Sequence, residues 1–314
     1  MTDGVGFIGV GFIGVGHMGG AMARRLLAAG IPLLVHDRDP AAESGLAALG
    51  ARVVASPLAM ADQARVIFLC LPSIQAQQAV CGGPQGLAAG SALRIVVETS
   101  TVGPHAVREL ADALQPRGIA VVDAPVSGGP RGAEAGTLSV MYSGDEACVA
   151  AVLPLLEMLA GKRFDVGRTP GLAQVCKLVN NAISAAGIMA ACEATVLGVK
   201  AGLDADTMLA AINAGSGRNA GTLDKFPAAI LPGTFNYGGP MGLMLKDLQL
   251  FIDQAQAHGV IGRLAPATLA AWQEAVDRTG FDADYSRLIQ HLEADAGVQV
   301  RSKKPAPHLA GGTT

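Results

Sequence analysis

A lysine and an amide that share one face of a long helical segment are the residues of this chain best suited to acid–base chemistry. Ala173, Lys177, Asn181 and Ser184 follow one another at spacings of four, four and three residues, which places them on one side of a helix. A lysine amine removed from water loses part of its preference for the charged form and can exchange a proton near neutral pH. The pattern predicts a proton-transfer group at Lys177 on the wall of a cleft. A solvated surface charge is the alternative interpretation.

The segment Asp123 to Gly129 offers a second kind of chemistry, the binding of an anion. It follows an apolar stretch, and its proline and paired glycines prevent it from continuing as a helix. The successive amide groups of Ser127, Gly128 and Gly129, with the serine hydroxyl, can form a concave nest for a carboxylate. A purely structural turn is the alternative, but it would explain the glycines and not the hydroxyl among them.

A glycine-rich repeat near the N-terminus predicts a dinucleotide site. A five-residue unit occurs three times there, so the pattern GxGxxG can be read in three registers. A dinucleotide loop needs a strand before it, a helix after it and an acidic residue about 20 positions further on to hold the ribose hydroxyls. Asp37 lies 23 residues after Gly14, but 28 and 33 residues after the first glycines of the other registers. The register that starts at Gly14 is therefore favoured, and an ordinary glycine-rich turn is the weaker alternative.

The favoured register gives each part of the loop a role. A strand is expected at Val10 to Ile13, and Gly14 makes the tight turn that follows it. Gly16 lets the backbone approach the pyrophosphate, and Gly19 lets the helix pack on the strand. The helix N-terminus then faces the phosphates with its unpaired N–H groups. The predicted cofactor loop consists of Gly14, Val15, Gly16, His17, Met18 and Gly19.

Asp37 also bears on which nicotinamide cofactor binds. A carboxylate there accepts hydrogen bonds from the ribose hydroxyls and repels a 2′-phosphate, which favours NAD. The neighbouring Arg38 could pair with such a phosphate, so NADP stays possible. Cofactor contacts are further expected at Leu71 and Pro72, and a ligand-binding role at Thr101, because open α/β sheets bind ligands at the carboxyl ends of their strands. Ordinary turn chemistry explains either loop equally well.

Alternating strand and helix signals in the first half of the chain predict the elements that position these residues. The expected fold class is an α/β Rossmann fold with a doubly wound, mostly parallel sheet, followed by an all-α domain. After the first strand, further strands are expected at Ile31–His36, Val66–Leu71, Ile95–Glu98, Ile119–Val122 and Leu138–Tyr142. A Gly/Pro cluster from Gly167 to Gly171 marks the change of domain, and the segment from Leu172 to about Lys200 is expected to be one long helix.

The predicted domains are a dinucleotide-binding Rossmann domain over residues 1–168, an all-helical substrate and oligomerisation domain over 169–297, and a disordered tail over 298–314. Residues 1–8 read as a spare copy of the first strand and are expected to be irregular. A chain of 314 residues agrees with two folded domains.

The composition narrows the class of function. A formal net charge of −3, with no basic stripe, does not favour binding to nucleic acid. No stretch of 18 uncharged apolar residues and no signal-peptide pattern are present, so a soluble, cytoplasmic protein without a membrane partner is expected. The five cysteines show neither a CxxC pair nor metal-ligand spacing, so reduced thiols and no metal are expected. Cys176 differs through its place beside Lys177, where alkylation could inactivate the protein.

Four motifs in order give the chain its resemblance to a known family. The sequence resembles the 3-hydroxyisobutyrate dehydrogenase family of β-hydroxyacid dehydrogenases through Gly11–Gly19, Asp123–Gly129, Lys177–Asn181 and Lys246–Leu248. The resemblance implies a Rossmann domain followed by a helical domain, assembly into homodimers or homotetramers, and the NAD(P)-dependent interconversion of a small 3-hydroxy carboxylic acid and its semialdehyde.

The resemblance also implies roles for individual residues. Lys177 matches the family's catalytic lysine, which takes the hydroxyl proton while a hydride goes to the nicotinamide ring. The loop of Ser127, Gly128 and Gly129 matches the part that binds the substrate carboxylate. The remaining assignments are Asn181 as a substrate-orienting amide, Thr101 as a cofactor contact, and Lys246 with Asp247 as the pair that closes the site, the lysine toward the cofactor and the aspartate toward the substrate.

Three departures from the family pattern leave the substrate open. Ala173 replaces a usual glycine and Gln174 a frequent asparagine, so the helix is expected to lie further from the cofactor. Gly239 replaces a common pocket aromatic, so the pocket is expected to be larger or reshaped. Reduction of tartronate semialdehyde, glyoxylate or succinic semialdehyde and oxidation of a threonate-type sugar acid are alternatives. An imine reductase, whose family typically lacks the lysine, and a non-catalytic NAD-binding interaction module are the readings from other classes.

Overall fold

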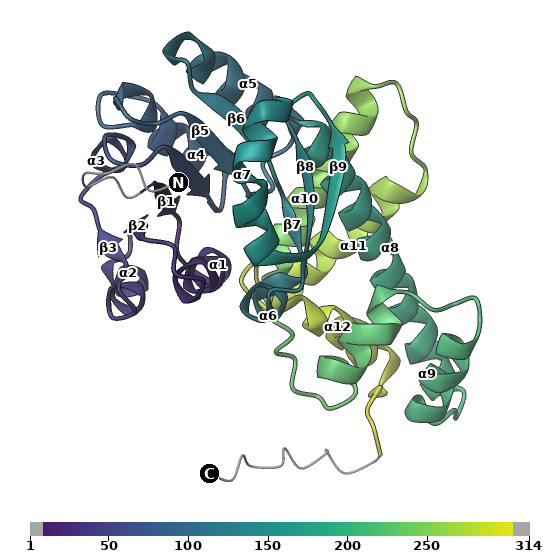
Figure 1. Cartoon of the computed structure of the whole chain (residues 1–314). Coiled ribbons are helices and arrows are strands. Elements are labelled where there is room, and N and C mark those ends of the chain that lie inside the picture. Colours follow the sequence, from purple (N-terminus) through teal and green to yellow (C-terminus); the bar gives the residue numbers. More distant parts are fainter. Residues whose placement is uncertain (1–8, 304–314) are drawn as a thin grey trace. The chain divides into compact units, whose positions relative to one another are not determined.

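The computed structural model describes residues 9–303, which divide into two compact units between Leu178 and Val179 (Figure 1). We call them the sheet unit, up to Leu178, and the helical unit, from Val179. The expectation of an irregular copy of the first strand at residues 1–8 lies outside the described residues.

The sheet unit is built on one sheet that has nine strands within residues 9–178, in the order β3-β2-β1-β4-β5-β6-β8-β7, with β9 paired to β8. The strands β1 to β6 pair in parallel, and β8 runs antiparallel to β6 and β7. Their bounds are β1 Val10–Ile13, β2 Leu33–His36, β3 Arg52–Val53, β4 Val66–Leu69, β5 Ile95–Glu98, β6 Ala120–Asp123, β7 Val126–Ser127, β8 Leu138–Ser143 and β9 Ala160–Gly167. The predicted Rossmann class is confirmed.

Successive residues of a strand point to opposite faces of the sheet, so the apolar strands place side chains on both faces. Helices cover both of these faces. In β1, Phe12 belongs to the core beneath α1 and α7, where its ring stacks on Phe68 with 5.6 Å between ring centres. Its neighbour Ile13 belongs to the core beneath α3 and α5. The helices of the unit are α1 His17–Ala28, α2 Pro40–Ala47, α3 Pro57–Ala61, α4 Ile74–Cys81, α5 Pro104–Leu114, α6 Gly129–Ala135 and α7 Glu146–Leu159, with short turns η1 Leu87–Ala89 and η2 Gln115–Arg117.

Three strands, β3, β7 and β9, were not predicted from the sequence. Two of them are only two residues long, and β9 is largely exposed and carries charged side chains such as Lys162 and Arg163. None of the three has the apolar run that marks a buried parallel strand. All the strands that were predicted have such a run, and each lies within about two residues of the expected bounds.

The helical unit is formed by helices around one apolar core. Its helices are α8 Leu172–Lys200, which begins in the sheet unit, α9 Ala205–Ala214, the π-helix η3 Gly221–Ile230, α10 Met241–Ala257, α11 Leu264–Thr279, the turn η4 Tyr285–Leu288 and α12 Ile289–Ala296. Apart from an isolated bridge between Pro240 and Asp284, residues 179–303 form no strand. Trp272 is fully buried in this core and donates a hydrogen bond from Nε1 to the carbonyl oxygen of Ala185 on α8.

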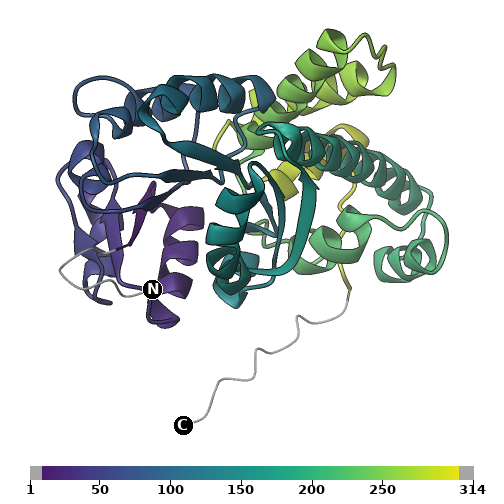
Figure 2. The ribbon, with the colours of Figure 1, turned by 45° about the horizontal axis from the view of Figure 1, so that its top comes forward.

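Helix α8 is visible along its length in Figure 2. By length and composition it is apolar enough to cross a membrane, and it is the one such helix within the described residues. The core helix of a globular protein has the same composition, and α8 also carries the buried polar side chains Lys177 and Asn181.

The tail predicted to be disordered from residue 298 packs at its start against the helical unit. Val300 is 1% exposed, and its amide donates to Oε1 of Glu293 at 2.8 Å. The guanidinium of Arg301 pairs with the same carboxylate at 2.6 Å and lies over the ring of Phe235 at 4.7 Å. These contacts hold the start of the segment in place, and they join residues that the Pro/Gly-rich composition of the tail does not indicate. Residues 304–314 lie outside the described residues.

Candidate active site

The glycine loop between β1 and α1 has the shape that the favoured register requires. Gly14 has φ +84°, and a Cβ atom on it would clash with the carbonyl oxygen of Cys70. A Cβ on Gly19 would clash with the carbonyl oxygen of Gly14, because helix and strand pack closely there. A Cβ on Gly16 would meet no atom within 4 Å. Packing therefore demands the first and third glycines, and the second faces open space, as the predicted approach of a pyrophosphate requires.

The other residues of the predicted cofactor loop lie at the start of α1. Val15 is buried, His17 is exposed as the first residue of the helix, and Met18 packs partly against the core. The amide groups in the first turn of a helix have no intrahelical partner, and here no capping side chain binds them either. This is the arrangement that holds phosphate at a helix N-terminus.

Asp37 follows β2 and ties the glycine loop to it. Its Oδ2 accepts a hydrogen bond from the amide of Val15 at 2.7 Å, and its Oδ1 accepts one from the amide of Asp39 at 2.9 Å. The amide of Asp37 itself donates to Oε1 of Glu43 at 2.7 Å. Arg38 is exposed. A second carboxylate, Glu43, thus lies beside the position predicted to bind the ribose, and nothing in the GxGxxG pattern marks that residue.

The loops after β4 and β5 are joined at the same edge of the sheet. The amide of Leu71, which precedes Pro72, donates to Oγ of Ser100 at 2.7 Å, and the amide of Ser100 donates to Oε1 of Glu98 at 2.8 Å. Thr101 follows directly and is half-buried. The structure therefore brings the predicted contacts Leu71, Pro72 and Thr101 onto adjacent loops.

Glu98 is a buried carboxyl group that the sequence did not single out. It is fully buried, and its Oε2 accepts a hydrogen bond from Nε2 of Gln77 at 2.7 Å. Burial raises its pKa from 4.5 to about 7, against the lowering effect of the hydrogen bonds from Ser100 and Gln77. At the same edge of the sheet, burial raises the pKa of the Cys70 thiol to about 12. Cys70 is therefore a neutral thiol, as the sequence led us to expect.

The segment predicted to form the anion nest, Ser127 to Gly129, joins the end of a strand to the start of a helix. Ser127 belongs to strand β7 and pairs with Ser139 of β8. Gly128 and Gly129 then have φ values of +131° and +65° and turn the chain into α6. Pro130 in the first turn of α6 has no amide hydrogen. Ser127, Gly128 and Gly129 are thus consecutive residues at the end of a strand, and their binding of an anion stays a prediction.

Asp123 has a role that the sequence analysis did not foresee: it caps the start of helix α8. Its Oδ2 accepts hydrogen bonds from the amides of Gly171 and Gln174, each at 3.0 Å. Oγ of Ser143 accepts one from the amide of Ala173 at 3.1 Å. Burial raises the pKa of Asp123 to about 6, while these hydrogen bonds lower it. Such a cap joins residues about 50 positions apart, so local sequence carries no signal for it.

Lys177 lies on α8 one turn after this cap and is 7% exposed. The alternative interpretation of Lys177 as a solvated surface charge is therefore wrong. Its neighbour Cys176 is partly exposed, and the five cysteines, all within the described residues, are free thiols. Among residues 9–303, no group of three or more His, Cys, Asp or Glu side chains could hold a metal ion.

The remaining predicted residues are joined by a hydrogen bond and an ion pair within the helical unit. Nδ2 of Asn181 donates to Oδ2 of Asp247 on α10 at 2.7 Å, and both side chains are buried. Nζ of Lys246 lies 2.9 Å from Oδ1 of the same carboxylate. Asn180 adds a hydrogen bond to Oδ1 of Asn181 at 3.1 Å. The structure thus brings Asn181, Lys246 and Asp247 together, as their assignment to one site requires.

Comparisons with known proteins agree with this arrangement. Residues 9–167 match the NAD binding domain of 6-phosphogluconate dehydrogenase, and residues 171–292 match a domain described as NAD-binding of NADP-dependent 3-hydroxyisobutyrate dehydrogenase. The 3-hydroxyisobutyrate dehydrogenase of Pseudomonas aeruginosa is 36% identical over 82% of this chain and 86% of its own. The chain belongs to the 3-hydroxyisobutyrate dehydrogenase family. The family that the sequence motifs indicated is confirmed.

Two other members of the family are similar over almost the full length of both chains. The 2-(hydroxymethyl)glutarate dehydrogenase of Eubacterium barkeri is 36% identical over 94% of this chain and 97% of its own. The structure of Mycobacterium tuberculosis 3-hydroxyisobutyrate dehydrogenase with L-serine superposes with a TM-score of 0.81, at 31% identity, over 91% of this chain and 99% of that one. The predicted NAD(P) cofactor is confirmed by the two domain matches.

One departure from the family pattern has a visible consequence at Gly239. A Cβ atom on Gly239 would lie 2.9 Å from a ring carbon of Tyr285, so the tyrosine ring occupies the space beside it. Tyr285 also packs edge-on against Tyr237 with 5.4 Å between ring centres. The pocket that the loss of an aromatic was expected to enlarge is therefore not open at Gly239 itself.

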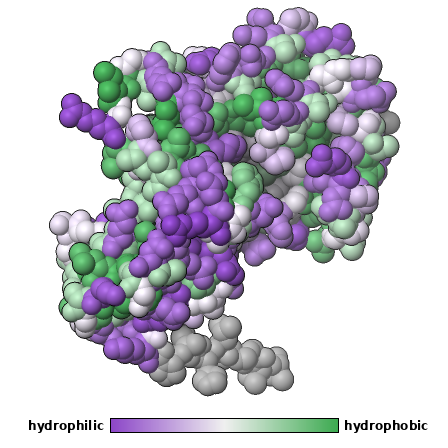
Figure 3. All heavy atoms as spheres, turned by 180° about the vertical axis from the view of Figure 1, so that it is seen from behind, coloured by the Kyte–Doolittle hydropathy of each residue, from purple (hydrophilic) through white to green (hydrophobic). Residues whose placement is uncertain are grey.

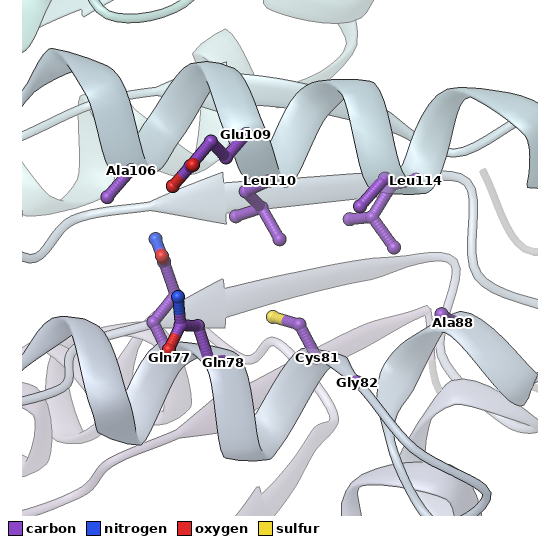
Figure 4. A pocket seen from close by; sticks show the side chains of 10 residues that line it. Gln77, Gln78, Cys81, Gly82, Ala88, Ala106, Glu109, Leu110 and Leu114 are labelled. Atoms are coloured by element: carbon purple, nitrogen blue, oxygen red, sulfur yellow. The ribbon is translucent and has the colours of Figure 1, made fainter.

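An open pocket of about 350 Å³ lies between α4 and α5, away from the predicted site residues (Figure 4). Apolar and small side chains such as Leu110, Leu114 and Cys81 line most of it, with Gln77 and Glu109 toward one end. None of the residues assigned to cofactor or substrate lines it. The family's chemistry therefore does not belong to this pocket.

Proposed function

We propose that this protein is an NAD(P)-dependent dehydrogenase that interconverts a small 3-hydroxy carboxylate and its semialdehyde, with Lys177 as general acid and base. The observation that supports it most is that Lys177 is buried on α8, one turn beyond the start of that helix. Asp123 and Ser143, at the edge of the sheet, cap this helix start. Family membership supplies the class of reaction.

In this proposal Gly14 to Gly19 and Asp37 hold the dinucleotide, with Leu71, Pro72, Thr101 and Lys246 as further contacts. The bound nicotinamide supplies the hydride acceptor. Lys177 in its uncharged form takes the proton from the substrate hydroxyl oxygen, and in the reverse direction its ammonium form returns that proton to the same oxygen. Asn181 and Asp247 orient the substrate.

We further propose the substrate class HOCH2–CH(R)–COO⁻. The names of the similar proteins support it, because 3-hydroxyisobutyrate and 2-(hydroxymethyl)glutarate each carry a hydroxymethyl group on the carbon that bears a carboxylate. L-serine, present with the similar solved structure, has the same skeleton. In this chain Ser127, Gly128 and Gly129 would bind the carboxylate through their hydroxyl and amide groups.

The acidic surroundings of the ribose position support NAD as the preferred cofactor. Asp37 and Glu43 both present carboxylates there, and like charges repel a 2′-phosphate. The exposed Arg38, which follows Asp37, is the group that would favour NADP.

A homodimer or homotetramer is proposed from the surface of α8. Val179, Ile183 and Leu197 are 43%, 70% and 69% exposed, and Val179 and Ile183 lie one turn apart on the same face of the helix. Apolar side chains also appear among polar ones on the face seen in Figure 3. A second copy of the chain would remove such side chains from water.

The proposal is tested by turnover of a panel of hydroxy acids and semialdehydes, followed by the absorbance of the reduced nicotinamide. We expect turnover of a hydroxymethyl carboxylate, and we expect Lys177→Met to lower kcat by about 10²- to 10⁴-fold while NADH still binds. The matched control is Lys200→Met, which alters an exposed lysine at the far end of the same helix.

Wild-type turnover by Lys177→Met would overturn the role of the lysine. Turnover confined to glyoxylate, succinic semialdehyde or a threonate-type acid would overturn the substrate class, whereas tartronate semialdehyde, whose alcohol has R = OH, belongs to it. No turnover of any compound in the panel, with NADH still bound, would favour a non-catalytic cofactor-binding module.

A further inference from the structure

Gln174, on the first turn of α8, uses all four hydrogen-bonding positions of its side-chain amide. Oε1 accepts from the amides of Val102 and Gly103, each at 3.0 Å. Nε2 donates to the carbonyl oxygen of Ser100 at 3.0 Å and to Oδ1 of Asp123 at 2.8 Å. The residue is 0% exposed, so water contributes nothing to these bonds. A primary amide has two donor hydrogens and two acceptor lone pairs, so its capacity is filled.

These four bonds join three separate parts of the sheet unit. Ser100 to Gly103 is the loop after β5 that contains Thr101, Asp123 ends β6, and Gln174 itself belongs to the helix that carries Lys177 three residues later. Oδ2 of Asp123 also accepts from the backbone amide of Gln174, so side chain and backbone bind the same carboxylate. The start of α8 is therefore held to both loops at one point.

We infer that Gln174 is a positioning residue, which sets the distance between the Thr101 loop and Lys177. The inference rests on the proposed function, in which Thr101 contacts the cofactor and Lys177 exchanges the substrate proton. Hydride and proton transfer need the cofactor and the base in one fixed geometry, and a displacement of about 1 Å can cost about a hundredfold in rate. A residue bound to both sides at once maintains that geometry.

The length of the side chain matters for this role. Asparagine offers the same amide but is one methylene shorter, so it cannot reach the amides of Val102 and Gly103 and the carboxylate of Asp123 from the same backbone position. Methionine has nearly the length of glutamine but cannot form any of the four bonds. The two substitutions separate the amide chemistry from the reach of the side chain.

The test compares Gln174→Met and Gln174→Asn with the wild type. We expect Gln174→Met to lower kcat by about ten- to a hundredfold, with Kd for NADH and KM changed much less. The kcat of Gln174→Asn is expected to lie between those of Gln174→Met and the wild type, because asparagine keeps part of the amide hydrogen bonding. Gln63→Met, on a half-buried glutamine elsewhere in the sheet unit, is the control for loss of an amide and is expected to behave as wild type.

Hydrogen exchange provides a readout that does not need turnover. In Gln174→Met, the peptide spanning residues 171–178 and the peptide with Ser100 to Gly103 are both expected to exchange faster, while the glycine loop of residues 14–19 keeps its protection. A uniform rise across the sheet unit would indicate general destabilisation and would overturn the positioning role. Wild-type kcat in Gln174→Met would overturn it as well.

Failure of the two proposals can be told apart. If the wild-type protein turns over no substrate, the proposed function fails, and hydrogen exchange still reports whether Gln174 links the two segments. If Lys177→Met is inactive and Gln174→Met retains full kcat, the proposed function stands and the positioning role is lost.

Discussion

At the scale of single residues, the side chains that matter most at the sheet edge are those that hold backbone amides. Asp37 binds the amides of Val15 and Asp39 with its two oxygens, and its carboxylate stands at the position proposed to bind the ribose of a dinucleotide. Whether that charge selects the cofactor is a question about one residue. A substitution that keeps the size of the side chain and removes its charge tests this.

We predict that Asp37→Asn shifts the preference toward NADP. The asparagine oxygen can still accept from Val15, which keeps the glycine loop tied to β2, although the bond from the amide of Asp39 is lost. The repulsion of a 2′-phosphate falls by one charge. A change of about 1.4 kcal/mol corresponds to about tenfold in the ratio of kcat/KM for NADP to that for NAD. Steady-state kinetics with both cofactors measures the ratio. Asp112→Asn, on an exposed residue of α5, is the control, and a ratio equal to the wild type in Asp37→Asn would contradict the prediction.

At the scale of elements, the carboxyl ends of β5 and β6 each place a buried acid beneath the loops that they support. Glu98 and Asp123 have pKa values raised to about 7 and about 6, in both cases mainly by burial. A raised pKa means that the folded state holds the proton more tightly than the unfolded chain. The stabilisation from each acid is therefore complete below its unfolded pKa and is lost as the pH rises toward the folded one.

We predict that Glu98→Gln makes unfolding less dependent on pH. In the wild type, Glu98 stabilises the fold at about pH 4.5 and loses that contribution by about pH 7, a change on the order of 3 kcal/mol. Glutamine stays neutral, so this part of the slope disappears, and the part from Asp123 remains. Urea unfolding across that pH range measures it. The same slope in both proteins would show that Glu98 does not titrate in this window.

At the scale of the whole molecule, the exposed apolar side chains of α8 are the basis of the proposed assembly into oligomers. An aliphatic side chain that is 70% exposed, such as Ile183, gains little from the fold of one chain. The family to which the chain belongs was expected from the sequence to form homodimers or homotetramers. A proposed interface between two copies of the chain would explain why Ile183 is apolar although it belongs to no core of the single chain.

We predict that Ile183→Glu shifts the protein toward a monomer. A charge introduced into an apolar interface costs free energy because it loses water without gaining a partner. Light scattering coupled to size exclusion measures the mass. Leu49→Glu places the same charge on a residue of the sheet unit that is 57% exposed, and it is expected to leave the mass unchanged. An oligomer that survives Ile183→Glu would exclude this face of α8 as the interface.

The sequence alone was sufficient for the strands with apolar runs, the glycine loop in its correct register, the long helix with Lys177, and the family. These depend on local properties, because periodicity, turn residues and motif spacing act over a few to about 20 positions. Tertiary structure decided that Lys177 is buried, that Asp123 and Gln174 hold the start of α8, and that Val300 and Arg301 bind the helical unit. Each of those outcomes depends on groups brought together by folding: Gln174 and Ser100 are 74 positions apart, and no local pattern of residue types reports such a pairing.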